Sequence, residues 1–248
     1  MRSALGLLGA LALGLPVIAL ADPDEYIHTP NIEYGEREID MKYGTEKDKD
    51  ENGGGRTSAG SIGVGYGATQ WWFTEAYVKY HKEPGDKTQY DAFEWENKLL
   101  VTEPNRYFVD VSLFTEFEVP RDRDEGYELR FGPLFQWDTG PLRWNANLLF
   151  GRVFHSKEEG PHVTELGYQF QVKYPLIHDV EVGVQAFGEM GKWNHWEPRE
   201  EQSHKIGPAV LGKVKLEGRQ AIRYNAAWLI GSNAAPRNTF RVQAEYEF

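Results

Sequence analysis

The chain has 248 residues, no cysteine and a formal net charge of −11 at pH 7. Without cysteine it has no disulfides, no thiolate metal sites and no thiol catalysis. The acidic balance argues against nucleic acid as a partner, since nucleic-acid-binding surfaces neutralise phosphates with Lys and Arg. After the N-terminus, the best apolar run is AAWLIG at 226–231. It is far shorter than the ~20 residues that a spanning helix needs, which excludes a helical membrane protein.

The N-terminus has the three parts of a secretory signal peptide. Arg2 precedes an apolar run over 4–20, and the run closes on an A-x-A cleavage site at 19–21. We therefore predict a signal peptide over 1–21 and a mature chain that starts at Asp22. An uncleaved membrane anchor is the alternative, but Gly and Pro interrupt the run and no stop-transfer pattern follows. Residues 22–248 contain no linker or shift in composition, which predicts one domain.

Segments in which apolar and polar residues alternate recur along the mature chain, as expected of strands with one apolar face. In the C-terminal TFRVQAEYEF, for example, Phe240, Val242 and Ala244 alternate with polar residues. The phase of the first segment shifts around Gly35, which indicates a bulge. We predict roughly twelve strands of the length of tilted membrane strands. They cover 32–44, 57–68, 71–82, 88–101, 107–119, 125–137, 141–155, 162–174, 179–190, 203–216, 220–230 and 238–248.

The links between these segments alternate between long and short. Long polar links such as TEKDKDENGGGR and GKWNHWEPREEQS alternate with tight ones such as GATQ, TEPNR, DTG and PLIH. Long loops at one end and short turns at the other, with both termini on the short-turn side, are typical of a single closed antiparallel transmembrane β-barrel. A water-soluble β-sandwich is the alternative. Trp71, Trp95, Trp137 and Trp228 lie near strand ends, as in interfacial girdles, and favour the all-β barrel.

The signal peptide, the amphipathic strands and the terminal aromatic residues Tyr246 and Phe248 resemble those of Gram-negative outer-membrane β-barrel proteins. In that family the barrel assembly machinery recognises the C-terminal aromatic residue. The resemblance thus implies that Tyr246 and Phe248 form an assembly signal, with outer-membrane lipid and this machinery as partners. With about twelve strands, the chain is similar in size to small porin-like families of uncharacterised substrate.

Two known outer-membrane lipid hydrolases of this architecture use a His-x-Ser pair, which places base and nucleophile on one face of a strand. Here the pairs His155–Ser156 and Ser203–His204 are adjacent, so their side chains point to opposite faces of an extended strand. We expect no enzyme. A lipid hydrolase stays as the third hypothesis.

Two loops carry side chains that bind ligands in other proteins. The loop over 191–204 contains Trp193, His195 and Trp196, which could hold a sugar or an aromatic ring, although a solvated loop explains them as well. The acidic stretch over 47–55 lacks the ligand order of a calcium loop and reads as a surface loop. We expect no metal site and no cofactor.

If the apolar faces meet lipid, the other face of each strand lines the lumen. Charged residues of both signs on that face would either form a structural ion-pair network or line a wet channel. The candidates are Glu94, Glu96, Lys98, Asp110, Glu116, Glu128, Arg130, Arg143, Glu165, Lys173, Glu181, Lys213, Arg223, Arg241 and Glu245. We expect a porin-like outer-membrane channel for small polar or aromatic solutes. The alternative is a structural or surface-interaction barrel whose lumen is closed by ion pairs.

Overall fold

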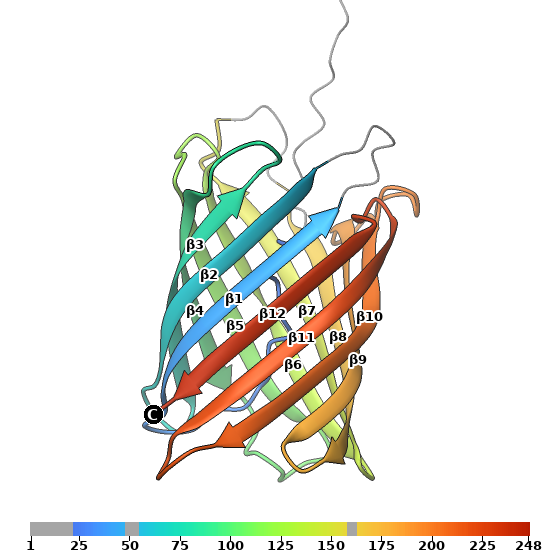
Figure 1. Ribbon diagram of the computed structural model, residues 1–248. Coiled ribbons are helices and arrows are strands. Elements are labelled where there is room, and N and C mark those ends of the chain that lie inside the picture. The colour runs from blue at the N-terminus through green and yellow to red at the C-terminus, as the bar shows by residue number, and fades with distance from the viewer. Residues whose placement is uncertain (1–21, 48–54, 158–162) are drawn as a thin grey trace, which may run out of the picture.

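Twelve antiparallel strands form one closed barrel (Figure 1). The computed structural model describes residues 22–47, 55–157 and 163–248, so the predicted signal peptide and most of the acidic stretch 47–55 lie outside the described residues. No helix in the described part of the chain has the length and hydropathy to cross a membrane. The strands are β1 (Arg37–Lys47), β2 (Arg56–Gly67), β3 (Trp72–Lys82), β4 (Gln89–Leu100), β5 (Asp110–Pro120), β6 (Tyr127–Thr139), β7 (Leu142–Phe154), β8 (Glu165–Ile177), β9 (Val180–Lys192), β10 (Ser203–Lys215), β11 (Ala221–Asn233) and β12 (Asn238–Glu247).

The last strand closes the barrel against the first. Glu245 lies opposite Asp40 in the pairing of β12 with β1. The Phe248 N–H donates to the carbonyl of Arg37 at 2.9 Å, so the pairing extends to the last residue. Closure leaves no strand edge unpaired, which a sheet in hydrocarbon requires. The predicted all-β closed barrel of about twelve strands is confirmed.

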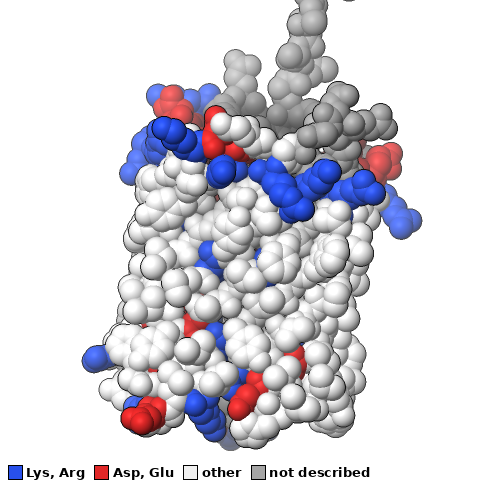
Figure 2. Space-filling view, viewed as in Figure 1, with Lys and Arg blue, Asp and Glu red and all other residues white. Residues whose placement is uncertain are grey.

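The outer face of the barrel is apolar. Large side chains on the predicted lipid-facing positions are exposed, including Trp228 at 60% and Ile230 at 59%. On the face that Figure 2 shows, a largely uncharged band crosses the middle of the barrel between charged residues at its two ends. An apolar band of this extent requires a partner other than water, and a lipid bilayer supplies one.

Several predicted boundaries differ from the structure, and three of these differences have a local explanation. The chain turns over 33–36, where the Glu36 N–H donates to the Glu33 carbonyl at 3.2 Å and Gly35 adopts a φ of 80°, so β1 begins only at Arg37. The predicted bulge at Gly35 is therefore wrong. The link between β4 and β5 covers 101–109, where Asn105 has a φ of 59° and its N–H donates to the Asp110 carboxylate at 2.8 Å. Part of the predicted link PLIH continues β8 to Ile177.

The chain before β1 lies inside the barrel and is named here the luminal segment (residues 22–36). It runs from the end of the barrel that carries the long loops to the end that carries the short turns (Figure 1). The carboxylate of Asp22 lies 2.6 Å from the Lys79 ammonium, near the loop end of β3. The prediction that both termini lie at the short-turn end is therefore wrong for the N-terminus. The chain over 22–36 thus threads the lumen before its first strand begins.

Candidate functional site: the barrel interior

The luminal segment makes hydrogen bonds to side chains of β2 and of β4 to β8. The Tyr26 hydroxyl donates to Glu96 at 2.8 Å, and the Ser61 hydroxyl donates to the carboxylate of Asp24 at 3.2 Å. Further along, the Ser112 hydroxyl donates to the carbonyl of Pro30 at 2.8 Å. Backbone hydrogen bonds within the segment occur in turns at its ends, where the Glu25 N–H donates to the Asp22 carbonyl and the Glu36 N–H to the Glu33 carbonyl; between these turns, side chains of the wall satisfy polar groups of the segment. These bonds hold the segment at a defined position in the lumen.

His28 lies at the centre of the segment and is buried, with 3% of its surface exposed. Its N–H donates to the Gln169 side chain at 3.1 Å, and the Asn147 amide donates to its carbonyl at 2.9 Å. Its ring packs against Phe114, with centroids 4.0 Å apart. One residue of the segment is thus fixed by three different strands, β8, β7 and β5.

Apolar packing also holds the segment. Ile27 lies in a buried cluster with Phe187, Leu211 and Leu229, which point inward from β9, β10 and β11. These inward apolar residues were not among the predicted lumen residues. The sequence signal for Leu229 is the apolar pair LI at 229–230, because one member of an adjacent pair in a strand must face the lumen.

Glycine provides the space in which the segment approaches the wall. A Cβ on Gly44 of β1 would lie 2.0 Å from the Pro23 carbonyl oxygen, and a Cβ on Gly67 of β2 would lie 1.9 Å from that of Glu33. Both contacts are with backbone atoms, which cannot rotate away. The two glycines thus allow close approach of the luminal segment near each end.

The wall opposite β1 carries a chain of buried amides. The Asn145 amide donates to Gln136 at 3.1 Å, Gln171 donates to Asn145 at 3.0 Å, and Gln185 donates to Gln171 at 2.6 Å. Arg241 on β12 donates to Gln185 at 2.6 Å and so links the chain of amides across the lumen. Satisfied polar networks of this kind hold side chains in one arrangement.

The described residues enclose a cavity toward each end of the barrel interior. The loop-end cavity has a volume of about 150 Å³ and is lined by ten carboxylate residues against the three cations Lys42, Lys79 and Arg130. The turn-end cavity has a volume of about 830 Å³ and a lining of mixed sign. Tyr26 lines both cavities, so its side chain lies at the boundary between them. The Lys42 ammonium sits 3.6 Å from the centre of the Tyr26 ring.

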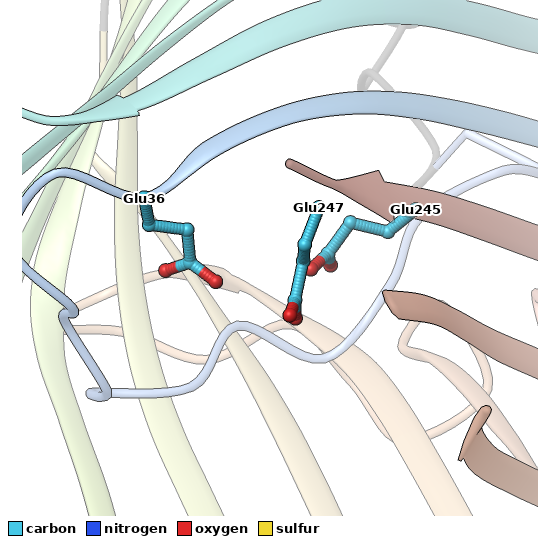
Figure 3. Close-up of side chains that lie close together, drawn as sticks. All are labelled: Glu36, Glu245 and Glu247. Atoms are coloured by element: carbon cyan, nitrogen blue, oxygen red, sulfur yellow. The ribbon is translucent and has the colours of Figure 1, made fainter. Parts of the chain in front are cut away.

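Carboxylates converge where β12 meets the start of β1. Glu36, Glu245 and Glu247 have oxygens within 4.8 Å of one another, and Figure 3 shows their side chains gathered on one side of the wall. Arg223 forms ion pairs with all three, at 3.6 Å to Glu36 and 3.5 Å to Glu245. Lys213 also pairs with Glu247. These five residues (Glu36, Lys213, Arg223, Glu245 and Glu247) are named here the Arg223 cluster. Their ion pairs account for the close approach of the three carboxylates.

No protein-family model and no curated protein matches the sequence. The fold does match solved structures. A COG4313 outer membrane channel from Pseudomonas putida F1 superposes with a TM-score of 0.63 at 10% identity, covering 91% of this chain and 98% of that one. The translocator domain of the autotransporter NalP from Neisseria meningitidis superposes with a TM-score of 0.53 at 13% identity, covering 87% and 89%.

The chain has the fold of bacterial outer-membrane β-barrels. The apolar outer band and this fold together support a location in the outer membrane.

Most of the predicted lumen residues of this outer-membrane barrel line one of its two cavities. Glu94, Glu96, Glu116, Glu128 and Arg130 line the loop-end cavity, and Lys98, Arg143, Lys173, Glu181, Lys213, Arg223 and Glu245 line the turn-end cavity. Arg241 is buried against Gln185, while Asp110 accepts the hydrogen bond of the 101–109 link. Glu165 is half-buried at the loop end of β8.

The predicted loop-binding residues of the barrel lie on its surface. Trp193, His195 and Trp196 are all exposed, and Trp193 packs edge-on against Phe150 of the outer face. The predicted assembly residues Tyr246 and Phe248 lie at the short-turn end, with rings stacked at 5.7 Å.

The two His–Ser pairs of the barrel have separate environments. Ser203 is buried, whereas the ring of His204 accepts or donates a hydrogen bond with Tyr168 at 3.0 Å on the outer side of β10. The Ser156 hydroxyl donates to the carbonyl of Asp124, and the His155 ring meets Tyr127 edge-on. In neither pair do these contacts orient the histidine as a base for its neighbouring serine.

Proposed function

We propose that this barrel is a channel that passes small polar solutes across the outer membrane by diffusion, with its constriction at the luminal segment. The observation that carries the proposal is the position of Tyr26 between two cavities lined by charged side chains. Cavities on both sides of one side chain form a path that a small displacement would join. Apolar interiors, by contrast, exclude ions and polar solutes.

The contacts of the segment are consistent with such a displacement. With no cysteine in the chain, only noncovalent contacts fix residues 22–30 in the lumen. Several of these contacts are ion pairs or hydrogen bonds with side chains of the wall, such as Asp22 with Lys79, which water and a polar solute can replace. The segment can therefore leave the wall without unfolding any strand, since β1 begins only at Arg37.

A second function is favoured by the same contacts taken together. The luminal segment binds side chains of β2 through β8, and its central residue His28 is buried. If these contacts persist, the lumen stays closed, and the barrel is a structural or surface-interaction protein that works through its long loops.

Single-channel recording in planar bilayers distinguishes the two. The wild-type barrel should give discrete conductance steps, and Tyr26→Ala should enlarge them because the side chain at the boundary is removed. Tyr34→Ala is the matched control: Tyr34 lies in the same segment but is 61% exposed. A folded barrel that stays silent in both the wild type and Tyr26→Ala would refute the channel and support the closed barrel.

A further inference from the structure

The charges that line the turn-end cavity are separated by sign. One arc of the wall consists of the luminal segment with β12, β1 and β3, and among the described residues its charged lining side chains are all carboxylates. They are Glu33, Glu36, Glu38, Asp40, Glu75 and Glu245. The cation that lines the cavity beside this arc is Lys98 on β4, which pairs with Glu75 at 3.3 Å. This arc is named the acidic arc.

The other arc, named the basic arc, runs from β7 to β11. Besides His178, its lining contains five Lys and Arg side chains against two carboxylates, Asp179 and Glu181. The basic residues are Arg143, Lys173, Lys213, Lys215 and Arg223. Most of the positive charge in the cavity therefore lies on consecutive strands, which makes the separation a property of the wall rather than of one ion pair.

The acidic arc and the basic arc meet on one side of the barrel, and elsewhere they face each other across the lumen. They meet between β11 and β12, where Arg223 of the basic arc pairs with Glu36 and Glu245 of the acidic arc. Figure 3 shows these two glutamates together with Glu247. In the closed strand order β7 lies half-way round the barrel from β1. Arg143 of β7, with its register partner Lys173 of β8, thus faces the strand that carries Glu38 and Asp40.

Groups on both faces keep hydrogen-bonding capacity. Asp40 is 2% exposed, and its Oδ1 has no hydrogen-bond partner among the described residues. Lys173 has an ion pair with Glu181 at 2.6 Å, and Arg143 uses two of its five N–H donors on Asp138. On the basic side the Arg143 side chain is 41% exposed and can reach a solute directly, whereas on the acidic side Asp40 Oδ1 is a buried acceptor that a solute would reach only through a local shift of the wall.

We infer that the turn-end cavity is a binding site for zwitterionic solutes, whose ammonium group meets Glu38 and Asp40 and whose carboxylate meets Arg143 and Lys173. A volume of about 830 Å³ has room for an amino acid or a short peptide. A dipolar solute aligned between the arcs is stabilised at both ends, whereas a singly charged one is attracted by one arc and repelled by the other. This inference rests on the proposed channel and names its substrate class.

Uptake into proteoliposomes tests the inference with the full-length chain. Three solutes of similar size are supplied as labelled tracers at constant salt: zwitterionic glycylglycine, anionic N-acetylglycine and cationic glycylglycinamide. Uncharged arabinose reports whether the barrel is open at all. Glycylglycine should enter faster than either analogue, on the order of fivefold for one additional charge contact at the wall. Equal rates for the three, or a preference for either singly charged analogue, would overturn the inference.

Variants of each arc assign the preference to its residues. Arg143→Gln with Lys173→Gln should abolish the advantage of glycylglycine over glycylglycinamide, since the carboxylate loses its partners. Glu38→Gln with Asp40→Asn should abolish the advantage over N-acetylglycine. Lys157→Gln is the control, because Lys157 is 75% exposed on a loop outside the lumen. If both double variants keep the wild-type ranking, the arcs do not select the solute.

The uptake of arabinose distinguishes failure of the proposed channel from failure of the proposed binding site. If arabinose does not enter, the proposed function is wrong, and calorimetric titration of the folded barrel in detergent then tests the site alone. Heat of binding for glycylglycine that exceeds that for N-acetylglycine, and that is lost in Arg143→Gln with Lys173→Gln, would support the site. No heat for any of the three solutes would overturn it.

Discussion

Gly44→Ala should release the loop end of the luminal segment from the wall. The new Cβ would lie 2.0 Å from the Pro23 carbonyl oxygen and 2.6 Å from the Asp24 nitrogen, both backbone atoms. Ordinary van der Waals contact begins at 3.4 Å, so the segment has to move by roughly 1.4 Å. A shift of that size breaks the hydrogen bond from Ser61 to Asp24 and weakens the ion pair of Asp22 with Lys79.

The free energy of docking changes by the loss of these contacts. A hydrogen bond contributes about 0.5–1.5 kcal/mol, and one to a charged group about 1.5–3 kcal/mol. We take about 2 kcal/mol as the combined loss, which corresponds to a factor of about 30 in the population of the undocked segment. The strands themselves should be unaffected, because the new methyl group points into the lumen.

A single cysteine reports this population, since the chain has none of its own. Ile27→Cys places a thiol in the buried cluster with Phe187 and Leu229, where a bulky maleimide reaches it only after the segment undocks. Labelling should be about 30-fold faster in the Gly44→Ala background. Tyr43→Phe, at the neighbouring outward-facing position, should leave the rate unchanged. Equal labelling rates in the Gly44→Ala and control backgrounds would refute the close approach of Pro23 to β1.

Two further changes test other parts of the barrel. Deletion of Phe248 should reduce the amount of folded barrel recovered from the outer membrane several-fold, while barrels that do fold should conduct normally; unchanged recovery would contradict its role as an assembly signal. Arg223→Met should lower the free energy of unfolding by about 1–2 kcal/mol, because three carboxylates lose a shared partner that is 40% exposed. Urea unfolding of the barrel in lipid measures this loss. Lys157→Met, at an exposed loop position, is the control. A urea midpoint of Arg223→Met as high as that of this control would show that the Arg223 cluster does not stabilise the fold.

The strands could be predicted from the sequence because their signal is local. In TELGYQFQVKY the alternation of Leu166, Tyr168 and Phe170 with polar residues fixes which face meets lipid, and the structure agrees. Charge in a strand whose other face is apolar has only the lumen to face. Because side chains alternate between the two faces of a strand, the positions of Lys173 and Glu245 relative to their apolar neighbours predict that both face the lumen. The structure places both in the lining of the turn-end cavity.

The luminal segment was not predicted, because its partners are remote in sequence. DPDEYIHTPNIEY contains two prolines and no periodicity, so nothing local distinguishes it from a leader before the first strand. Tyr26 finds Glu96 at a separation of 70 residues, and the His28 N–H finds Gln169 at 141. The space for the segment depends on Gly44 and Gly67. In a strand sequence, glycine indicates only a weak preference for β-structure and does not show that another segment packs against it.

The separation of charge in the turn-end cavity also depended on the closed strand order. The sequence places Glu38 and Arg143 more than a hundred residues apart, and only closure of β1 on β12 brings their strands to opposite sides. The alternation of side chains along each strand predicts which residues face the lumen, but not which of them lie opposite one another across it. Mixed sign therefore appeared as a uniform lining rather than as two arcs.

The most direct test of the account is the conductance of a barrel without the upper part of its luminal segment. The predicted signal peptide (residues 1–21) is joined to Asn31. The variant lacks residues 22–30 and keeps the turn in which the Gly35 N–H donates to the Gly67 carbonyl at 2.8 Å. In planar bilayers this variant should open in steps several-fold larger than those of the full-length chain, because Tyr26 no longer separates the two cavities. A folded variant whose conductance equals that of the wild type would contradict the claim that the luminal segment sets the constriction.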